Sequence, residues 1–269
     1  MTDAPTGPQT WHHGLVARWW AEFNEPADDE LKFYRATIQR FGEPALDLAC
    51  GTGRLLLPLL AEGFDVDGID VSDDMLAFAR ERAAEEGLEV RLLTQAMHEL
   101  DPWRKYRTVY ICDSFGIGGR REDDEEALRR IHDALEPGGA LVFSHDLPHS
   151  YADQWVYWLP ELRSELPLPW STNGPRRRAA NGDEIELTGR LVDVDSESRL
   201  LTMQIRPRLW RDGVMVAQEE HTILISQYWQ PEVLAMLADA GFGPVEVQAA
   251  YSGRLAKPDD QTLVFIAQR

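Results

Sequence analysis

The sequence predicts an α/β protein built on a doubly wound, mostly parallel seven-stranded sheet. Short apolar segments alternate with amphipathic segments of helical spacing through residues 45–146, as expected for right-handed β-α-β crossovers. A helical segment and two apolar segments follow in 231–267 and complete the sheet. Between them, residues 184–226 contain long strand-like segments separated by the turn sequences DSES and RDG, which indicates an antiparallel insert after the fifth strand.

The individual elements are predicted from spacing, caps and breakers. Ser72, followed by Asp73 and Asp74, caps a helix, Pro137-Gly138-Gly139 ends another, and Pro231 and Gly241 bracket the last. The expected helices are 11–23, 28–40, 54–62, 72–86, 122–135 and 231–240. The expected strands are 45–49, 64–70, 88–94, 108–112, 140–146, 184–194, 200–210, 214–226, 245–250 and 262–267.

These elements divide the chain into five expected parts. They are a disordered tail (1–10), an N-terminal helical cap (11–42), an α/β core (43–148), the antiparallel β insert (149–229) and a C-terminal part of the core (230–269). The chain of 269 residues, 43% hydrophobic, is long enough for one large elaborated domain.

Charge and composition narrow the function classes. Acidic residues outnumber basic ones by 46 to 27, a net charge of −19, which disfavours nucleic acid and anionic membranes as partners. No apolar segment reaches the length of a membrane span, and the polar start does not resemble a secretory signal. Two cysteines and no metal-ligand spacing fit a cytoplasmic protein without a metal site.

The stretch ALDLACGTGR, residues 45–54, places a glycine loop between a strand and a helix. Gly51 and Gly53 let the backbone approach a ligand closely, although a tight turn without a ligand explains a lone Gly-x-Gly equally simply. Asp70 ends the next strand 19 positions after Gly51, where a carboxylate can accept ribose hydroxyls. Leu56 stands where a dinucleotide fold has a third glycine, which argues against NAD.

These motifs resemble class I S-adenosylmethionine-dependent methyltransferases, whose fold is Rossmann-like. DLACGTGR, DGIDVSDDML, the YICDSF strand end and LEPGGALVFSHD carry the resemblance over about residues 30–146, and QPEVLAMLADAGF extends it weakly to 231–269. It implies the cofactor S-adenosyl-L-methionine.

The same resemblance assigns residues to the cofactor. The residues expected at its methionine end are Asp47, Gly51, Gly53 and Tyr34, with Cys112 at the end of the fourth strand. Asp70 is expected at the ribose, and Met75 and Met97 at the adenine. The chain departs from the family at Ala96, where many members have an acid that receives the adenine amino group.

Acceptor-side residues are expected at the ends of the fourth and fifth strands. Asp113 follows the fourth strand, and His145 in the fifth is the candidate general base, with a structural histidine as the alternative. Trp155 and Trp158 belong to an aromatic segment that suits a substrate pocket wall, or alternatively attaches the insert to the core. Arg176–Arg178 is expected to be a solvated loop tip, with recognition of an anion as the alternative.

We therefore predict a methyltransferase that acts on a small-molecule acceptor, with N- or O-methylation favoured. Methyl transfer from a sulfonium needs alignment rather than a side-chain nucleophile. The alternatives are a non-catalytic cofactor-binding scaffold and another transferase on the same cofactor, such as an aminopropyltransferase. The insert is expected to form either the pocket or the interface of a homo-oligomer.

Overall fold

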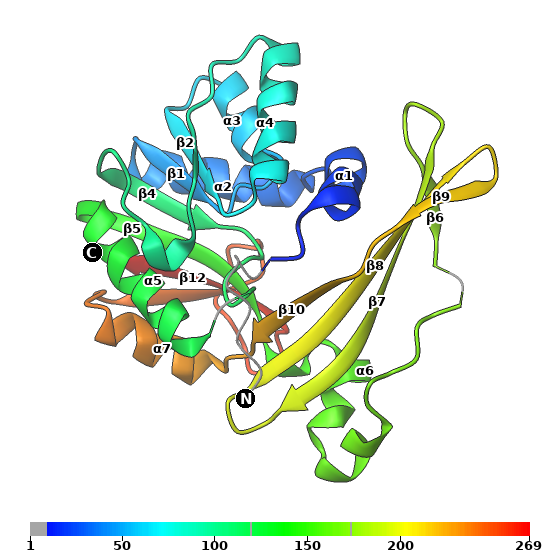
Figure 1. The fold of residues 1–269 in the computed structure, drawn as a ribbon. Coiled ribbons are helices and arrows are strands. Elements are labelled where there is room, and N and C mark those ends of the chain that lie inside the picture. The colour runs from blue at the N-terminus through cyan, green and yellow to red at the C-terminus, as the bar shows by residue number, and fades with distance from the viewer. Residues whose placement is uncertain (1–9, 119, 173) are drawn as a thin grey trace.

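Two sheets and the helices around them make up the structure, a computed structural model that describes residues 10–118, 120–172 and 174–269 (Figure 1). All of the predicted tail except Thr10 lies outside the described residues. The α-helices are α1 (Gly14–Phe23), α2 (Asp28–Phe41), α3 (Leu56–Ala61), α4 (Asp73–Glu86), α5 (Arg121–Ala134), α6 (Ala152–Trp155) and α7 (Gln230–Asp239). The 3-10 helices are η1 (Met97–Glu99), η2 (Pro148–Ser150), η3 (Val156–Trp158) and η4 (Pro160–Glu165).

The first sheet has seven strands in the order β11-β12-β5-β4-β1-β2-β3. They are β1 (Ala45–Leu48), β2 (Val66–Asp70), β3 (Leu92–Thr94), β4 (Tyr106–Ile111), β5 (Leu135–Asp146), β11 (Val245–Ala249) and β12 (Thr262–Gln268). β12 pairs antiparallel with both neighbours, and the strands from β5 to β3 are parallel. The predicted doubly wound, mostly parallel sheet is therefore confirmed.

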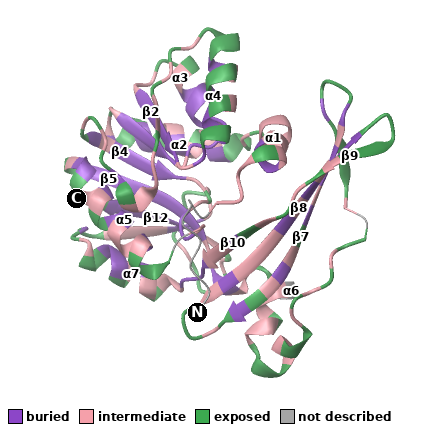
Figure 2. Cartoon of the chain, viewed as in Figure 1, coloured by how far each residue is buried: buried purple, intermediate pink, exposed green. Residues whose placement is uncertain are grey.

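The apolar core lies on both faces of this sheet. α5 and α7 cover one face, where Leu128, Ile131 and Val233 are fully buried. On the other face Ile38 of α2 and Leu56 of α3 pack in a second cluster. The central strands are accordingly buried along their lengths (Figure 2). Burial on both faces is typical of parallel strands that helices cover on each side.

The second sheet is antiparallel, as predicted, and belongs to the insert. Its strands are β6 (Arg176–Arg178), β7 (Glu184–Asp195), β8 (Leu200–Arg211), β9 (Val214–Gln218) and β10 (His221–Ser226). The single strand expected over 214–226 is wrong, because the chain breaks at Glu219-Glu220, where the Glu219 carboxylate accepts a hydrogen bond from the Leu15 amide. The loop tip expected at 176–178 is also wrong, because these arginines form β6 and pair with β7.

Two sets of contacts fix the insert to the core. The loop after β4 pairs with β10, because the Gly118 amide donates to the Leu224 carbonyl and the Ser226 amide to the Gly116 carbonyl, both at 2.8 Å. The start of α1 touches both parts, since Gly14 also donates to Asp74 of α4 at 2.7 Å. α1 therefore bridges the core and the long strands of the insert (Figure 1). Among the described residues, no helix combines the length and the apolar character that a membrane crossing requires.

Candidate active site

A cavity of about 710 Å³ opens at the carboxyl ends of the parallel strands. That edge is where open α/β sheets bind their ligands. Its walls come from the glycine loop, the chain before and within α1, the loops after β2, β3 and β4, the end of β5, and strands β8 and β10 of the insert. The volume falls in the range of small-molecule sites, roughly 300–1,000 Å³.

The glycine loop and Asp70 form one hydrogen-bonded unit in this cavity. The Gly51 amide donates to one oxygen of the Asp70 carboxylate at 2.8 Å, and the Ser72 amide donates to the other at 2.8 Å. Burial raises the pKa of Asp70, while these amide donors oppose the shift. Each carboxylate oxygen keeps a second lone pair, so a cavity-lining Asp70 can still accept hydroxyl groups.

Gly51 leaves the space that a ligand needs. Its φ is +55°, and a Cβ there would lie 3.0 Å from Cε of Met75. Gly53, with φ +80°, is not among the residues that line the cavity; a Cβ there would strike Leu57 at 2.8 Å. Gly53 therefore shapes the turn beneath the loop. Its predicted direct contact with the cofactor stays a prediction.

Three other predicted cofactor residues line the same end of the cavity: Asp47, Met75 and Met97. Asp47 is 2% exposed, and burial raises its pKa to about 7. Ala96 also lines this end, and it offers no side-chain acceptor. The neighbouring Gln95 reaches the cavity, but its side-chain oxygen already accepts the Asp101 amide at 2.9 Å.

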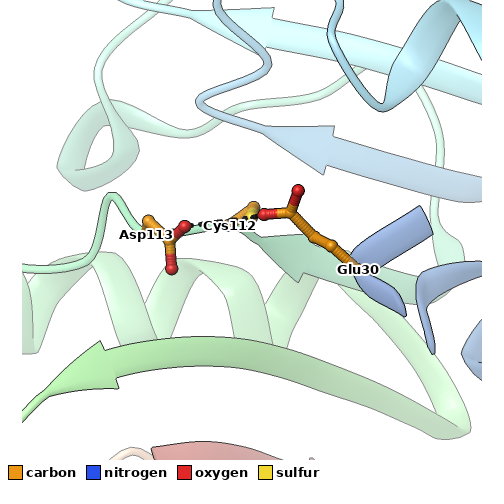
Figure 3. Close-up of side chains that lie close together, drawn as sticks. All are labelled: Glu30, Cys112 and Asp113. Atoms are coloured by element: carbon orange, nitrogen blue, oxygen red, sulfur yellow. Dashed lines mark hydrogen bonds between the residues drawn. The ribbon is translucent and has the colours of Figure 1, made fainter. Parts of the chain in front are cut away.

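Cys112 lines the cavity and lies between the carboxylates of Glu30 and Asp113 (Figure 3). Its Sγ is 2.9 Å from Oε1 of Glu30 and 3.2 Å from a guanidinium nitrogen of Arg54. Glu30, 4% exposed, forms a two-nitrogen ion pair with Arg54. Glu30, Cys112 and Asp113 could in principle hold a cation, but the guanidinium already neutralises this group, and burial raises the pKa of the thiol. The cluster therefore works as a structural ion pair.

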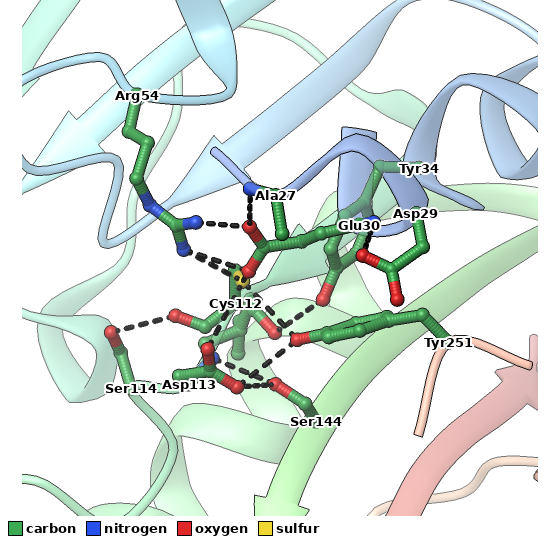
Figure 4. A network of polar contacts seen from close by, with 11 residues as sticks. Ala27, Asp29, Glu30, Tyr34, Arg54, Cys112, Asp113, Ser114, Ser144 and Tyr251 are labelled. Atoms are coloured by element: carbon green, nitrogen blue, oxygen red, sulfur yellow. Dashed lines mark hydrogen bonds and ion pairs between the residues drawn. The ribbon is translucent and has the colours of Figure 1, made fainter. Parts of the chain in front are cut away.

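Asp113 is the exposed end of this network (Figure 4). Its φ is +53°, a left-handed conformation that non-glycine residues rarely adopt. Ser144 holds it there, accepting from the Asp113 amide at 2.7 Å and donating to its Oδ1 at 2.6 Å. The Tyr251 hydroxyl donates to the same oxygen at 3.0 Å. The result is a carboxylate that is held in place and presented to the cavity.

Tyr34 lies beneath this network rather than in the cavity wall. It is fully buried, and its hydroxyl donates to the Ile111 carbonyl at 3.3 Å. Its ring packs on Tyr110 and Tyr251, with centroids 4.9 and 5.7 Å away. The described geometry gives Tyr34 a supporting position, one layer behind Cys112 and Asp113.

His145 reaches the cavity but is 6% exposed. Its Nε2 lies 3.2 Å from the Tyr228 carbonyl and 3.3 Å from the Tyr228 amide. Burial lowers its pKa, which keeps the ring neutral at pH 7. A neutral ring is the form that a base needs, yet the main chain occupies Nε2. The catalytic role of His145 stays a prediction, and the geometry favours the structural alternative.

The aromatic segment after β5 divides in two. Tyr151 lines the cavity and donates to Asp146 at 2.6 Å. Trp155 and Trp158 are not among the lining residues: they pack on each other at 5.4 Å, and Trp155 also packs on Trp229 at 5.6 Å. Trp158 also packs on the apolar cluster of Leu191, Val194 and Leu201, so the contacts of both tryptophans lie within the insert. Their contact with a substrate stays a prediction.

The three arginines of β6 are likewise engaged away from the cavity. Arg176 stacks on Trp210 with its Cζ 3.8 Å from the ring centroid, and Arg177 lies 4.6 Å from the ring of Phe23. Arg178 pairs with Glu184 at 2.9 Å. These contacts account for the cluster without an anionic ligand.

Sequence reasoning missed four residues of this site: Glu30, Arg54, Ser144 and Tyr251. Arg54 directly follows the glycine loop, so its position was a usable signal. Ser144 precedes His145 at the end of a predicted strand. Glu30 and Tyr251 come from segments far from Asp113 in sequence, and no local pattern marks them.

Comparisons with known proteins agree with this geometry. Residues 45–139 match the model of a methyltransferase domain family. A protein of Geobacillus sp. (strain WCH70), named as a methyltransferase, is 30% identical over 259 residues, covering 91% of this chain and 93% of its own length. A dTDP-3-amino-3,4,6-trideoxy-alpha-D-glucopyranose N,N-dimethyltransferase of Streptomyces venezuelae is 34% identical over 113 residues, covering 41% of this chain and 46% of that protein.

A solved structure shows the same fold. The S-adenosylmethionine-dependent methyltransferase from Clostridium acetobutylicum superposes with a TM-score of 0.72 at 18% identity, covering 94% of this chain and 96% of that one.

The glycine loop, the acid at the end of β2 and the cavity define a nucleoside-binding α/β enzyme. With the similarity that spans the chain, this protein belongs to the class I S-adenosylmethionine-dependent methyltransferases. The residues present fit S-adenosylmethionine: Gly51 leaves room beside Met75, Asp70 offers free lone pairs, and Asp47 offers a carboxyl group to an amino group.

Proposed function

We propose that this methyltransferase methylates the nitrogen of a small-molecule amine. The observation that carries the proposal is Asp113, a carboxylate exposed in the cavity beside the cofactor loop and held by Ser144 and Tyr251. An amine arrives at neutral pH as a cation, and a fixed carboxylate attracts that cation and orients its N–H groups.

The cofactor end of the cavity is assigned residue by residue. Asp70 would hold the ribose hydroxyls, Asp47 the amino group of the methionine part, and Met75 and Met97 the adenine. S-Adenosylmethionine supplies a methyl group on a sulfonium: a nitrogen–carbon bond forms while the carbon–sulfur bond breaks and leaves its electron pair on sulfur.

The acceptor end handles alignment and the proton. An ammonium must lose one proton before its nitrogen has a free electron pair, and Asp113 is an exposed carboxylate in the cavity that can accept a hydrogen bond from it. Ser144 and Tyr251 restrict the carboxylate to one orientation, which limits the directions from which an amine can approach. Asp113 therefore binds the amine and accepts its proton in this proposal, in place of His145.

The relatives include both N- and O-methyltransferases by name, and the acidic pocket is what favours nitrogen here. The Streptomyces venezuelae relative is an N,N-dimethyltransferase by name. An acidic acceptor pocket favours an amine over a carboxylate or a phosphate. The small-molecule acceptor, the cytoplasmic location and a homo-oligomer remain parts of the proposal.

The test is methyl transfer from labelled S-adenosylmethionine to a panel of small amines and matched alcohols. We expect label in the amines and a strong loss in Asp113→Asn. Label in the alcohols alone would show O-methylation and contradict N-methylation. Binding of S-adenosylhomocysteine with no transfer to any acceptor would favour the scaffold, and transfer of an aminopropyl group from the decarboxylated cofactor would favour the aminopropyltransferase.

A further inference from the structure

The acceptor end of the cavity has an apolar wall that comes from the insert. Leu201 and Met203 of β8 and Ile225 of β10 line it. Ile225 bridges to Ile117 of the loop after β4, and Phe115 of that loop also lines the cavity. The main-chain bonds between this loop and β10 hold the apolar side chains against the same cavity as Asp113.

Carboxylates dominate the charged side chains of the cavity wall. Among the described lining residues the carboxylates are Asp47, Asp70, Asp113, Asp123, Asp124 and Asp146. Arg54 is the one arginine or lysine among them, and Glu30 and Cys112 already hold its guanidinium. A phosphate in this cavity would meet acidic side chains and no free arginine or lysine.

We propose that the acceptor is an amine carried on an apolar body that bears no phosphate, an assignment that rests on the proposed N-methylation. The ammonium lies at Asp113, and the apolar body lies against Met203, Ile225 and their neighbours. A nucleoside-diphosphate-linked amino sugar would bring two phosphates, for which the described lining residues offer no free arginine or lysine.

Three probes with one shared body test this assignment: 2-phenylethylamine, 2-phenylethanol and 2-phenylethyl phosphate. Each is titrated calorimetrically into the full-length protein saturated with S-adenosylhomocysteine. We expect the amine to bind at least tenfold more tightly than the alcohol, and the phosphate to give no detectable binding. Phosphate binding as tight as that of the amine, or no binding by any probe, would overturn the proposal.

Three variants separate the contribution of the charge from that of the apolar wall. Asp113→Asn should reduce the amine to the affinity of the alcohol. Met203→Ser should weaken amine and alcohol alike, by about tenfold, because it removes apolar surface that both bury. Met215→Ser is the matched control, since Met215 of β9 is 51% exposed and outside the cavity. If the Met203 and Met215 variants bind the amine with equal affinity, the apolar wall does not contact the ligand as proposed.

Methyl transfer to the amine is measured in parallel. Tight amine binding without transfer would contradict the proposed function and leave the ligand class standing. Methyl transfer only to the nitrogen of phosphate-bearing acceptors would contradict the phosphate-free ligand class but would agree with N-methylation.

Discussion

The two ends of the cavity are built in different ways. The proposed cofactor end consists of the glycine loop and Asp70, which a hydrogen bond from the Gly51 amide to the Asp70 carboxylate joins across neighbouring strands. The acceptor end combines the loop after β4, the end of β5 and strands β8 and β10 of the insert. Local sequence thus specifies the first end, whereas tertiary packing of distant segments specifies the second. The four predictions below test that contrast.

The largest effect is expected at the glycine loop, where Gly51→Val should weaken S-adenosylhomocysteine binding about a hundredfold or more. A β-branched residue at φ +55° is strained, and its side chain meets Met75. Calorimetric titration measures the affinity. Gly87→Val is the control, because Gly87 has φ +68° with open space around a Cβ; equal loss in both variants would show that strain, not the cavity, is responsible.

Asp47 should make cofactor binding depend on pH. A bound amino group favours the ionised carboxylate, so affinity should fall below pH 7, approaching about tenfold per pH unit. The raised pKa has the opposite effect on the protein without ligand: the contribution of Asp47 to stability is present at acid pH and decreases as pH rises toward 7.

Titrations with S-adenosylhomocysteine at several pH values measure this dependence. In Asp47→Asn the fall in affinity below pH 7 that comes from protonation of Asp47 should disappear. An unchanged pH profile in that variant would remove Asp47 from the cofactor site.

At the acceptor end, we expect Asp113→Asn to lower kcat/KM for an amine by about 10- to 100-fold, since a hydrogen bond to a charged group contributes about 1.5–3 kcal/mol. His145→Gln should mainly lower Tm, because Nε2 contacts the Tyr228 main chain. If turnover instead falls by about 10²–10⁴ in the His145 variant with Tm retained, His145 is the base.

The smallest effect belongs to the group that orients Asp113. Tyr251→Phe removes one of two hydroxyl donors to the Asp113 carboxylate and leaves Ser144 in place, so only part of the orientation is lost and KM for the amine should rise about two- to twelvefold, or about 0.5–1.5 kcal/mol. Steady-state kinetics measure this change. Tyr157→Phe is the control, because Tyr157 packs in the insert away from the cavity, and it should leave KM unchanged. Equal changes of KM in both variants would show that Tyr251 does not orient Asp113.

The sequence predicted the first sheet, and placed the glycine loop and Asp70 at its edge, because these signals are local. A strand, a glycine loop and an acid after the next strand occur in order, and parallel pairing brings them together. Tyr251 and Glu30 could not be found in this way, since only the folded chain brings them to Cys112 and Asp113. Trp155 and Trp158 show the converse: aromatic density indicated a pocket wall, but it cannot tell a pocket from a packed junction.

The most direct test of this two-ended cavity is a paired titration of Asp70→Ala and Asp113→Asn with S-adenosylhomocysteine and with 2-phenylethylamine. The structure predicts that Asp70→Ala loses about tenfold or more in affinity for S-adenosylhomocysteine, whereas Asp113→Asn keeps that affinity and loses affinity for the amine. Equal losses of both ligands in both variants, in protein that remains folded, would contradict the division of the cavity into a cofactor end and an amine end.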